Sequence, residues 1–318
     1  MKTSKRRIVT AVVGAVAVVS VLASAVTALN VNAAEQPKEK VELRPVDIAF
    51  INKIESKAQA GDVTAQLKLG FFYYNGMHVV KDLEKAAYWL EKAHRQGDLS
   101  ASNLLGELYL FNADGDDIKL AMSYVYFHIA ADGGLALGQF NLGVSYYVGQ
   151  GVEKDHDKAF KLFLASAKQD LTVSKFYLAL MYERGHGTSK NLAKAFSWYK
   201  SGSDNGDAYS ASRLGYFYGT GRGVKVSATK AFSYYKIAAV RGLGSAQLTI
   251  SKLYYNGIGV HKNVVKAYVW AVFAEARGVK NAKAFVAKVS ADLTYNEIKM
   301  ARKWVLKLVN DGLDSEVI

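Results

Sequence analysis

The stretch from Gly242 to Gly278 reads GLGSAQLTISKLYYNGIGVHKNVVKAYVWAVFAEARG and decides the fold, because its pattern recurs along the chain at a fixed interval. The clearest marker is Tyr254, the last of six tyrosines spaced 36, 37, 36, 36 and 36 residues apart. The series consists of Tyr73, Tyr109, Tyr146, Tyr182, Tyr218 and Tyr254. A period of this length predicts a stack of supersecondary units, none of which can bury its apolar face alone.

The first half of each unit predicts a helix with one buried stripe, called helix A below. In the first unit of the series, Ala65, Leu69, Gly70 and Tyr73 recur at helical spacing. A small residue stands three positions before each periodic tyrosine and allows a neighbouring helix to approach closely. Helix A then ends at a glycine-rich turn such as Gly257-Ile-Gly-Val260, whose first glycine supplies the left-handed conformation that closes a helix.

The second half of each unit predicts helix B, which begins at a polar residue four positions before an alanine. The side-chain oxygen of such a residue accepts hydrogen bonds from the N–H groups of the first turn, worth about 1 kcal/mol. The predicted N-caps are Asp82, Asp117, Asp155, Asn191, Ser227 and Asn263, and the alanines are Ala86, Ala121, Ala159, Ala195, Ala231 and Ala267. Inward-facing aromatic residues follow, namely Trp89, Trp198, Tyr234 and Trp270. Helix B then closes at a glycine: Gly97, Gly206, Gly242 or Gly278.

The combined pattern is A-x-x-x-L-G-x-x-Y-x-x-G-x-G-V, then D/N-x-x-K-A-x-x-W and a closing glycine. It resembles the Sel1-like repeat family, which is related to tetratricopeptide repeats. Six such repeats cover residues 61–278, and the resemblance implies an all-α fold, a right-handed α/α solenoid of helix pairs. The second repeat departs from the pattern, because Asn112-Ala-Asp-Gly115 replaces the glycine turn and Ala121 comes one residue early.

Further segments flank the predicted repeats. Residues 1–34 predict a secretory signal, since four basic residues precede the apolar stretch 8–29 and a small-residue cleavage site follows. Alternatively, residues 8–29 remain as an inner-membrane anchor; in both cases the basic flank directs the rest of the chain outward, to the periplasm or beyond. Residues 35–60 are expected to form a linker and a capping helix. Residues 279–318 are expected to form C-terminal capping helices, the last one introduced by a capping box at Thr294–Glu297.

The charge of the chain indicates which partners to expect. The formal net charge is +13, and without residues 1–34 it is +9, from 37 basic and 28 acidic residues. Such a surface attracts acidic proteins or anionic polysaccharide. The sequence has no zinc-finger spacing and no dense basic run interleaved with aromatic residues, so nucleic acid is not an expected partner.

No catalytic, metal or cofactor site is predicted. Cysteine is absent, which excludes thiolate metal sites and cysteine nucleophiles, and no two of the six histidines have the spacing of a helical metal pair. The segment 112–117 is similar to a calcium loop, but placing Gly115 sixth puts Leu110 first and Ala121 twelfth, and neither side chain is a ligand. An envelope hydrolase, which cysteine-rich relatives linked to β-lactam hydrolysis suggest, is therefore the least favoured function.

A surface for a partner is the feature that remains. Two positions on helix A flank the periodic tyrosine on the side away from the core, and by resemblance to tetratricopeptide domains they face a ligand. The candidate groove residues are Phe71, Tyr74, Tyr147, Arg213, Tyr216, Lys252 and Tyr255. Aromatic side chains anchor interfaces, and Arg213 and Lys252 favour an acidic partner. The sequence leaves open whether these aromatic residues instead pack between A helices, whereas the periodic tyrosines are expected in the core.

The predicted function is that of a non-enzymatic scaffold or regulator that binds a peptide or partner protein in the bacterial cell envelope. The resemblance supports it, because Sel1-like proteins are implicated in signalling and in the assembly of envelope complexes. The alternative is binding of cell-wall or anionic exopolysaccharide, for which aromatic rows and basic charge are also suited.

Overall fold

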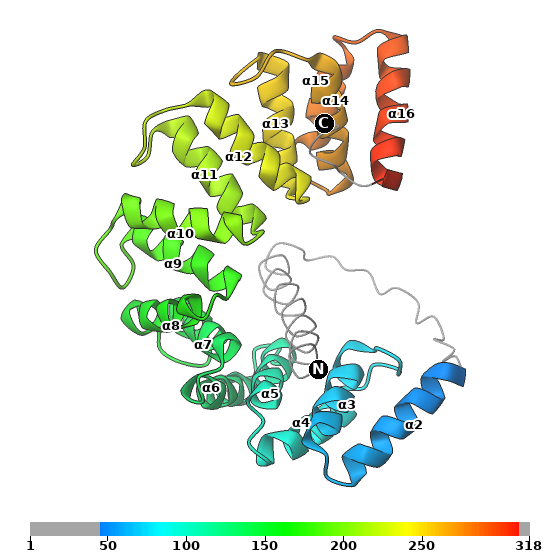
Figure 1. The fold of residues 1–318 in the computed structure, drawn as a ribbon, viewed down its shortest axis with the longest axis vertical. Coiled ribbons are helices and arrows are strands. Elements are labelled where there is room, and N and C mark those ends of the chain that lie inside the picture. The colour runs from blue at the N-terminus through cyan, green and yellow to red at the C-terminus, as the bar shows by residue number, and fades with distance from the viewer. Residues whose placement is uncertain (1–44, 312–318) are drawn as a thin grey trace, which may run out of the picture. The chain divides into compact units, whose positions relative to one another are not determined.

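A computed structural model describes residues 45–311, and these residues form α-helices without any strand (Figure 1). The helices are α2 (Pro45–Gln59), α3 (Val63–Asn75), α4 (Leu83–Arg95), α5 (Leu99–Phe111), α6 (Asp117–Asp132), α7 (Ala136–Val148), α8 (His156–Lys168), α9 (Thr172–Arg184), α10 (Leu192–Asp204), α11 (Ala208–Thr220), α12 (Ala228–Val240), α13 (Gly244–Asn256), α14 (Val264–Ala276), α15 (Ala282–Ser290) and α16 (Tyr295–Asp311). The predicted all-α solenoid is confirmed for this part of the chain. The predicted signal or anchor, residues 1–34, lies outside the described residues.

The chain divides after Gln169 into two compact units. The first unit, described from residue 45, contains α2 and the helix pairs α3/α4, α5/α6 and α7/α8, in which each helix packs on the next. Helix α2 packs on α3 and buries Ile51, Ile54 and Ala58 in one cluster with Leu69. The open side of the first pair is therefore covered by an extra helix, as a terminal unit of a solenoid requires.

The second unit, residues 170–311, contains the pairs α9/α10, α11/α12 and α13/α14, followed by α15 and α16, which both pack on α14. Its main apolar cluster joins Ile250 and Trp270 of the last pair to Val289 of α15 and Leu308 of α16. The capping box is confirmed, because the Glu297 carboxylate accepts hydrogen bonds from Thr294 N and Oγ1 at 2.8 and 2.7 Å. Among the described helices, none combines the length and apolarity that crossing a membrane would need.

The small residue of helix A lies where the two helices of a pair approach most closely. A Cβ atom on Gly106 would lie 2.5 Å from the ring of Phe127 in α6, and one on Gly70 would lie 2.5 Å from Leu90 in α4. Contacts this short cannot be accommodated in a packed core without displacing the partner. The prediction that this column permits close helix approach is thus confirmed.

The glycine-rich turn makes three interactions, two within its own repeat and one with the preceding repeat. Its first glycine closes helix A in the left-handed conformation, as Gly257 does at φ +69°. The tyrosine that marks the repeat accepts a backbone hydrogen bond from the N-cap residue, for example Asn263 N to Tyr254 O at 2.9 Å. The second glycine, Gly259, lies against the start of the preceding helix B, where its Cβ would meet the Ala228 carbonyl oxygen at 2.1 Å.

A lysine of helix B lies over the ring of five of the six periodic tyrosines. The Nζ atom is between 5.0 and 5.6 Å from the ring centroid in the pairs Lys85/Tyr73, Lys158/Tyr146, Lys194/Tyr182, Lys230/Tyr218 and Lys266/Tyr254. In the second repeat, Tyr109 instead stacks on Tyr126. The core expectation holds for Tyr146, Tyr182 and Tyr254, which are buried, whereas Tyr73, Tyr109 and Tyr218 are half-buried. Five of the six tyrosines therefore join helix A to helix B through both the backbone and the ring, whereas Tyr109 does so through its ring, since Asp116 N donates to the Ala113 carbonyl oxygen instead.

Two expectations about helix B are wrong in detail. Asp116, not Asp117, is the N-cap of α6, since its carboxylate accepts hydrogen bonds from Ile118 N and Lys119 N at 2.9 and 3.3 Å. Helix α6 has 16 residues, whereas the other B helices have 13, so the segment that lacks the glycine turn supplies an additional helical turn. As a result Ala121 is exposed and Ser123 takes the buried position. Also, Trp198 and Tyr234 are half-buried rather than inward-facing.

Replacing Asp116 by alanine should lower the free energy of unfolding by about 1 kcal/mol, because two N–H groups of the first turn lose their acceptor. Replacing Asp117 by alanine should cost only a few tenths of a kcal/mol, since this residue contributes only its charge near the helix N-terminus. Urea unfolding of the two variants distinguishes them. A larger loss for the Asp117 variant would restore the original N-cap assignment.

Candidate partner-binding surface

The structure divides the predicted groove residues between the two units. Phe71, Tyr74 and Tyr147 lie on α3 and α7 of the first unit, and the other four lie on α11 and α13 of the second unit: Arg213, Tyr216, Lys252 and Tyr255. The two sets therefore have to be considered separately.

The three aromatic residues of the first unit are largely packed. Phe71 is only 6% exposed and belongs to the core cluster of α3, α4 and α5. Tyr74 and Tyr147 are half-buried, and the Tyr147 ring packs edge-on against His156 with centroids 5.1 Å apart. Phe71 therefore packs against neighbouring helices, which is the alternative that the sequence leaves open. It offers little surface to a partner.

A buried carboxyl group lies beside these residues. Glu107 of α5 is 4% exposed, and its Oε1 accepts hydrogen bonds from Asn103 Nδ2 at 3.0 Å and Asn141 Nδ2 at 3.3 Å. Burial raises the pKa of the Glu107 carboxyl to about 7, although the two amide hydrogen bonds oppose this change. Burial, and to a lesser extent Glu107, also raises the pKa of Tyr74. This polar network joins α5 to α7, but it is closed to solvent.

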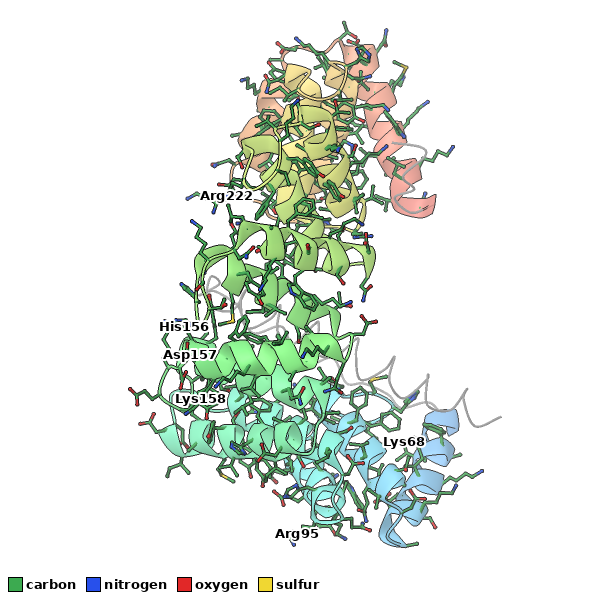
Figure 2. The ribbon with its side chains drawn as sticks, turned by 60° about the vertical axis from the view of Figure 1, so that its left-hand side comes forward. Lys68, Arg95, His156, Asp157, Lys158 and Arg222 are labelled. Carbon is green, nitrogen blue, oxygen red and sulfur yellow. The ribbon has the colours of Figure 1, made fainter. Side chains whose placement is uncertain are left out.

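The second unit presents an open arrangement around Tyr216 of α11. The guanidinium carbon of Arg213 lies 4.9 Å from the Tyr216 ring centroid, and that of Arg222 lies 5.7 Å away. Arg213 belongs to α11, whereas Arg222 lies in the glycine turn between α11 and α12. Arg222 is labelled in Figure 2. Both arginine side chains are 34% exposed. Two partly exposed cations therefore lie near one half-buried aromatic ring.

Both arginines converge on one buried carboxylate, that of Glu183 in α9. Arg213 Nη2 donates a hydrogen bond to Glu183 Oε1, and Arg222 Nη2 lies 3.5 Å from the same oxygen. The Tyr199 hydroxyl donates to Glu183 Oε2 at 2.8 Å. Burial, together with the Glu183 charge, raises the pKa of Tyr199. Burial opposes ionisation of Arg213, but the Glu183 carboxylate more than compensates and raises the pKa of Arg213.

The residues one repeat further along form a second group of cations and aromatic rings. Lys262 and Lys288 lie 5.7 and 5.1 Å from the Tyr255 ring centroid, and Lys252 lies 5.8 Å from that of Phe285. The Tyr255 hydroxyl donates a hydrogen bond to Asp292 at 2.6 Å, and this bond raises the pKa of Tyr255. Tyr255 thus connects α13 to the terminal helices, while the Lys252 side chain is exposed.

The charge of the chain is concentrated in the second unit. Residues 170–311 contain 22 lysine and arginine residues and eight aspartate and glutamate residues, a net charge of +14. Residues 45–169 contain 12 basic and 15 acidic residues, a net charge of −3. Counting charges over each half of the chain would have shown this asymmetry, which the total conceals. The basic character is a property of one unit and not of the whole protein.

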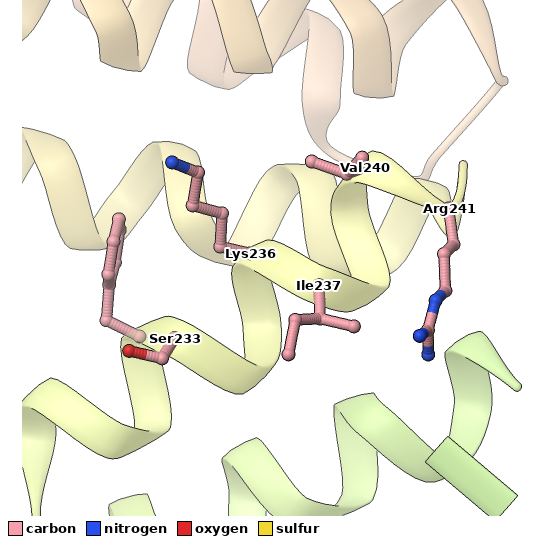
Figure 3. A pocket seen from close by; sticks show the side chains of 6 residues that line it. Ser233, Lys236, Ile237, Val240 and Arg241 are labelled. Atoms are coloured by element: carbon pink, nitrogen blue, oxygen red, sulfur yellow. The ribbon is translucent and has the colours of Figure 1, made fainter. Parts of the chain in front are cut away.

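Two shallow hollows on the second unit are lined by residues other than Arg213, Tyr216 and Arg222. One is lined by residues of α12 and by the C-cap of this helix, namely Phe232, Ser233, Lys236, Ile237, Val240 and Arg241 (Figure 3). The Arg241 side chain is already engaged, because its Nη1 donates to the Ser203 carbonyl oxygen at 2.9 Å. The other is lined by Tyr218, Val224, Lys225, Val226, Ser227 and Lys230. Neither hollow contains a carboxylate or a histidine that would suggest catalysis.

The described residues contain no group of three histidine, cysteine, aspartate or glutamate side chains that could hold a metal ion. The segment 112–117 belongs to this searched part of the chain. Its Asp116 carboxylate is used as the N-cap of α6.

The chain matches the family model described as Sel1 repeat at residues 63–98, 136–171, 172–207, 208–243 and 244–278, which together exceed half of its length. The interval between the first two matches contains α5 and α6, the pair with the longer helix B. Among solved structures, the crystal structure of a Sel1 repeat protein from Oxalobacter formigenes is 25% identical, with a TM-score of 0.51, and covers 79% of this chain and 83% of that one.

Two relatives from Arabidopsis thaliana are similar over shorter stretches. One is the ERAD-associated E3 ubiquitin-protein ligase component HRD3B, 37% identical over 103 residues, which are 32% of this chain and 16% of the relative. The other is component HRD3A, 40% identical over 57 residues, or 18% of this chain and 8% of the relative. This chain spans less than a fifth of either relative. With five matched repeats over more than half of its length, the chain belongs to the Sel1 repeat family.

Proposed function

We propose that the protein is a non-enzymatic scaffold that binds an acidic partner protein through the A-helix surface of its second unit. The observation that carries this proposal is the group around Tyr216, where Arg213 and Arg222 share one buried carboxylate and retain one positive charge. Aromatic and arginine side chains provide most of the binding energy at protein interfaces. The net charge of +14 over residues 170–311 of the same unit attracts an acidic surface and accelerates its encounter.

The family supports a binding function, since Sel1 repeats often serve as protein–protein interaction modules. The two Arabidopsis relatives are by name components of a ubiquitin-protein ligase, hence members of an assembly. We further propose that the partner lies in the bacterial cell envelope, because residues 1–34 have the pattern of an export signal or an anchor. Fractionation of cells would test this location, and recovery of the chain in the cytosol alone would contradict it.

Binding of an anionic polysaccharide is a second candidate, which the charge of the second unit favours. Sugar rings, however, stack on open aromatic faces. In the second unit, a cation lies within 6 Å of the ring centroid of Tyr216, of Tyr255 and of Phe285. A sugar would therefore have to compete with these cations for the aromatic faces. Sedimentation with purified peptidoglycan or exopolysaccharide tests this candidate, which requires Tyr216→Ala to weaken the binding.

The proposal predicts that Tyr216→Ala lowers recovery of the partner from envelope extract by about tenfold or more, the usual effect of losing an aromatic interface anchor. Affinity capture followed by quantitative mass spectrometry measures this recovery. The matched control is Tyr295→Ala, since this tyrosine is 79% exposed on α16 and outside the A-helix surface. Equal recovery by the wild type and both variants would contradict the proposal, provided that circular dichroism shows all three folded.

A further inference from the structure

We infer that Arg213 and Arg222 form a receptor for a single carboxylate group of an acidic peptide segment, and that Glu183 is the residue that positions them. This inference rests on the proposed protein-binding function and names the chemistry of the site within it. The three side chains come from α9, from α11 and from the turn after α11, so the site exists only when the first two helix pairs of the second unit are stacked.

The two guanidinium groups retain donors for a ligand. Each guanidinium has five N–H bonds, and each arginine directs one Nη2 atom toward Glu183 Oε1. The Nε atoms of Arg213 and Arg222 are buried and have no hydrogen-bond partner within the described part of the chain, so a ligand does not reach them. About one third of each side chain is exposed, and the Nη1 atoms are not among the buried unpaired atoms of the described residues, so the Nη1 groups are the donors that a ligand can reach. A planar fork matches the geometry of a carboxylate, which accepts two parallel hydrogen bonds.

Glu183 holds the pair together. Without a shared anion, two guanidinium groups over one ring would repel each other and separate. The Glu183 side chain is only 4% exposed and is held on its other oxygen by Tyr199. It therefore stays in place when a ligand binds, and it neutralises one of the two positive charges. The remaining charge of +1 suits a monoanionic carboxylate better than a dianionic phosphate.

A peptide fits the surroundings better than a glycan. The guanidinium carbons of both arginines lie within 6 Å of the Tyr216 ring centroid, so the ring face toward them is not available for a sugar to stack on. One repeat further along, Lys252 stands at the position equivalent to Tyr216 in the 36-residue period, and Lys262 and Lys288 lie beside Tyr255, so the row of cations continues. An extended segment with several aspartate or glutamate side chains can reach both groups.

The test uses fluorescence anisotropy of the full chain with a labelled peptide of alternating aspartate and glutamate. Arg213→Lys and Arg222→Lys keep the charge but lose the fork, and each is expected to weaken binding about tenfold or more. The control Lys225→Gln removes a charge from the same turn and should change binding less than about twofold. Equal losses in all three variants, or no binding by the wild type, would overturn the inference in favour of diffuse electrostatic attraction.

Glu183→Gln separates positioning from charge. This variant raises the charge of the site to +2, so a purely electrostatic surface would bind the acidic peptide more tightly. Positioning by Glu183 instead predicts weaker binding, by about tenfold, because the arginines are no longer held together. If Glu183→Gln does not fold, Arg213→Lys and Arg222→Lys remain the test of the carboxylate receptor. A polyuronate of equal carboxylate density serves as the second probe, and equally strong binding with the same arginine dependence would overturn the assignment to a peptide.

Peptide binding and partner capture together distinguish failure of the carboxylate receptor from failure of the protein-binding surface. If the acidic peptide does not bind but capture of the cellular partner still depends on Tyr216, only the carboxylate receptor is wrong. If capture is also unaffected by Tyr216→Ala, the proposed protein-binding surface is wrong as well.

Discussion

Replacing Gly259 by alanine is expected to lower the free energy of unfolding by about 3 kcal/mol or more, the sum of a steric and a backbone cost. The added Cβ would lie 2.1 Å from the Ala228 carbonyl oxygen and 2.4 Å from its carbon. These are backbone atoms at the start of α12, and they cannot rotate away. The residue also has φ +72°, where an L-amino acid is strained. Thermal unfolding followed by circular dichroism should show a melting temperature lower by about 6–12 °C.

Gly278→Ala is the matched control for this variant. Gly278 has nearly the same backbone conformation, with φ +68°, but a Cβ there would meet no atom within 4 Å. Only the strain of the left-handed conformation remains, and we expect a loss of about 1 kcal/mol. Equal destabilisation of the two variants would contradict this explanation. It would mean that the second glycine is required for a reason other than the close approach of the turn to the preceding helix B.

Replacing Glu107 by glutamine is expected to remove most of the dependence of first-unit stability on pH between 5 and 8. In the folded protein the Glu107 pKa is about 7, against an ordinary value of 4.5, so the folded state retains its proton more strongly than the unfolded state. The wild type therefore loses stability as pH rises from about 4.5 to 7, by about 3 kcal/mol, and remains at this lower level above pH 7. Glutamine has no proton to lose and can still accept the bonds from Asn103 and Asn141.

Urea unfolding at pH 5 and pH 8 measures this difference. The Glu107→Gln variant should be more stable than the wild type at pH 8 by about 2–3 kcal/mol and nearly equal to it at pH 5. Glu84→Gln serves as the control, because Glu84 is exposed on α4 and should leave the pH dependence unchanged. A wild type as stable at pH 8 as at pH 5 would show that Glu107 ionises at an ordinary pH in a hydrated site.

The repeat architecture was predictable because each repeat uses the same few residues for local interactions. Gly257 closes helix A, and Asn263 caps helix B by accepting a hydrogen bond from Lys266 N at 2.8 Å. Such interactions connect residues at most four positions apart, so spacing reveals them. The second repeat was misassigned where two adjacent aspartates both had the chemistry of an N-cap. The period aligned Asp117 with Ala121, whereas the longer helix begins after Asp116.

The candidate site was only partly predictable, because its defining contacts cross from one repeat to the next. Arg213 and Tyr216 were found from their positions on helix A. Glu183 and Arg222 were not predicted as members of the site, since the ion pair of Arg213 with Glu183 joins residues 30 positions apart, and Arg222 belongs to a turn. Phe71 was predicted as a groove residue but is not part of a surface. Its position in the repeat is equivalent to that of Tyr216, yet its ring is buried. Which members of a column reach the surface depends on side chains of the neighbouring repeats.

The most direct test of the proposed binding surface is site-specific photo-crosslinking in living cells. A benzophenone amino acid replaces Gly219 or Lys252, which are exposed positions on the helices A of the second unit, and Ile237 in the hollow on α12 serves as the control. The proposal predicts that positions 219 and 252 crosslink the same partner protein and that position 237 does not. Crosslinks from position 237 alone, or equally from all three positions, would contradict it.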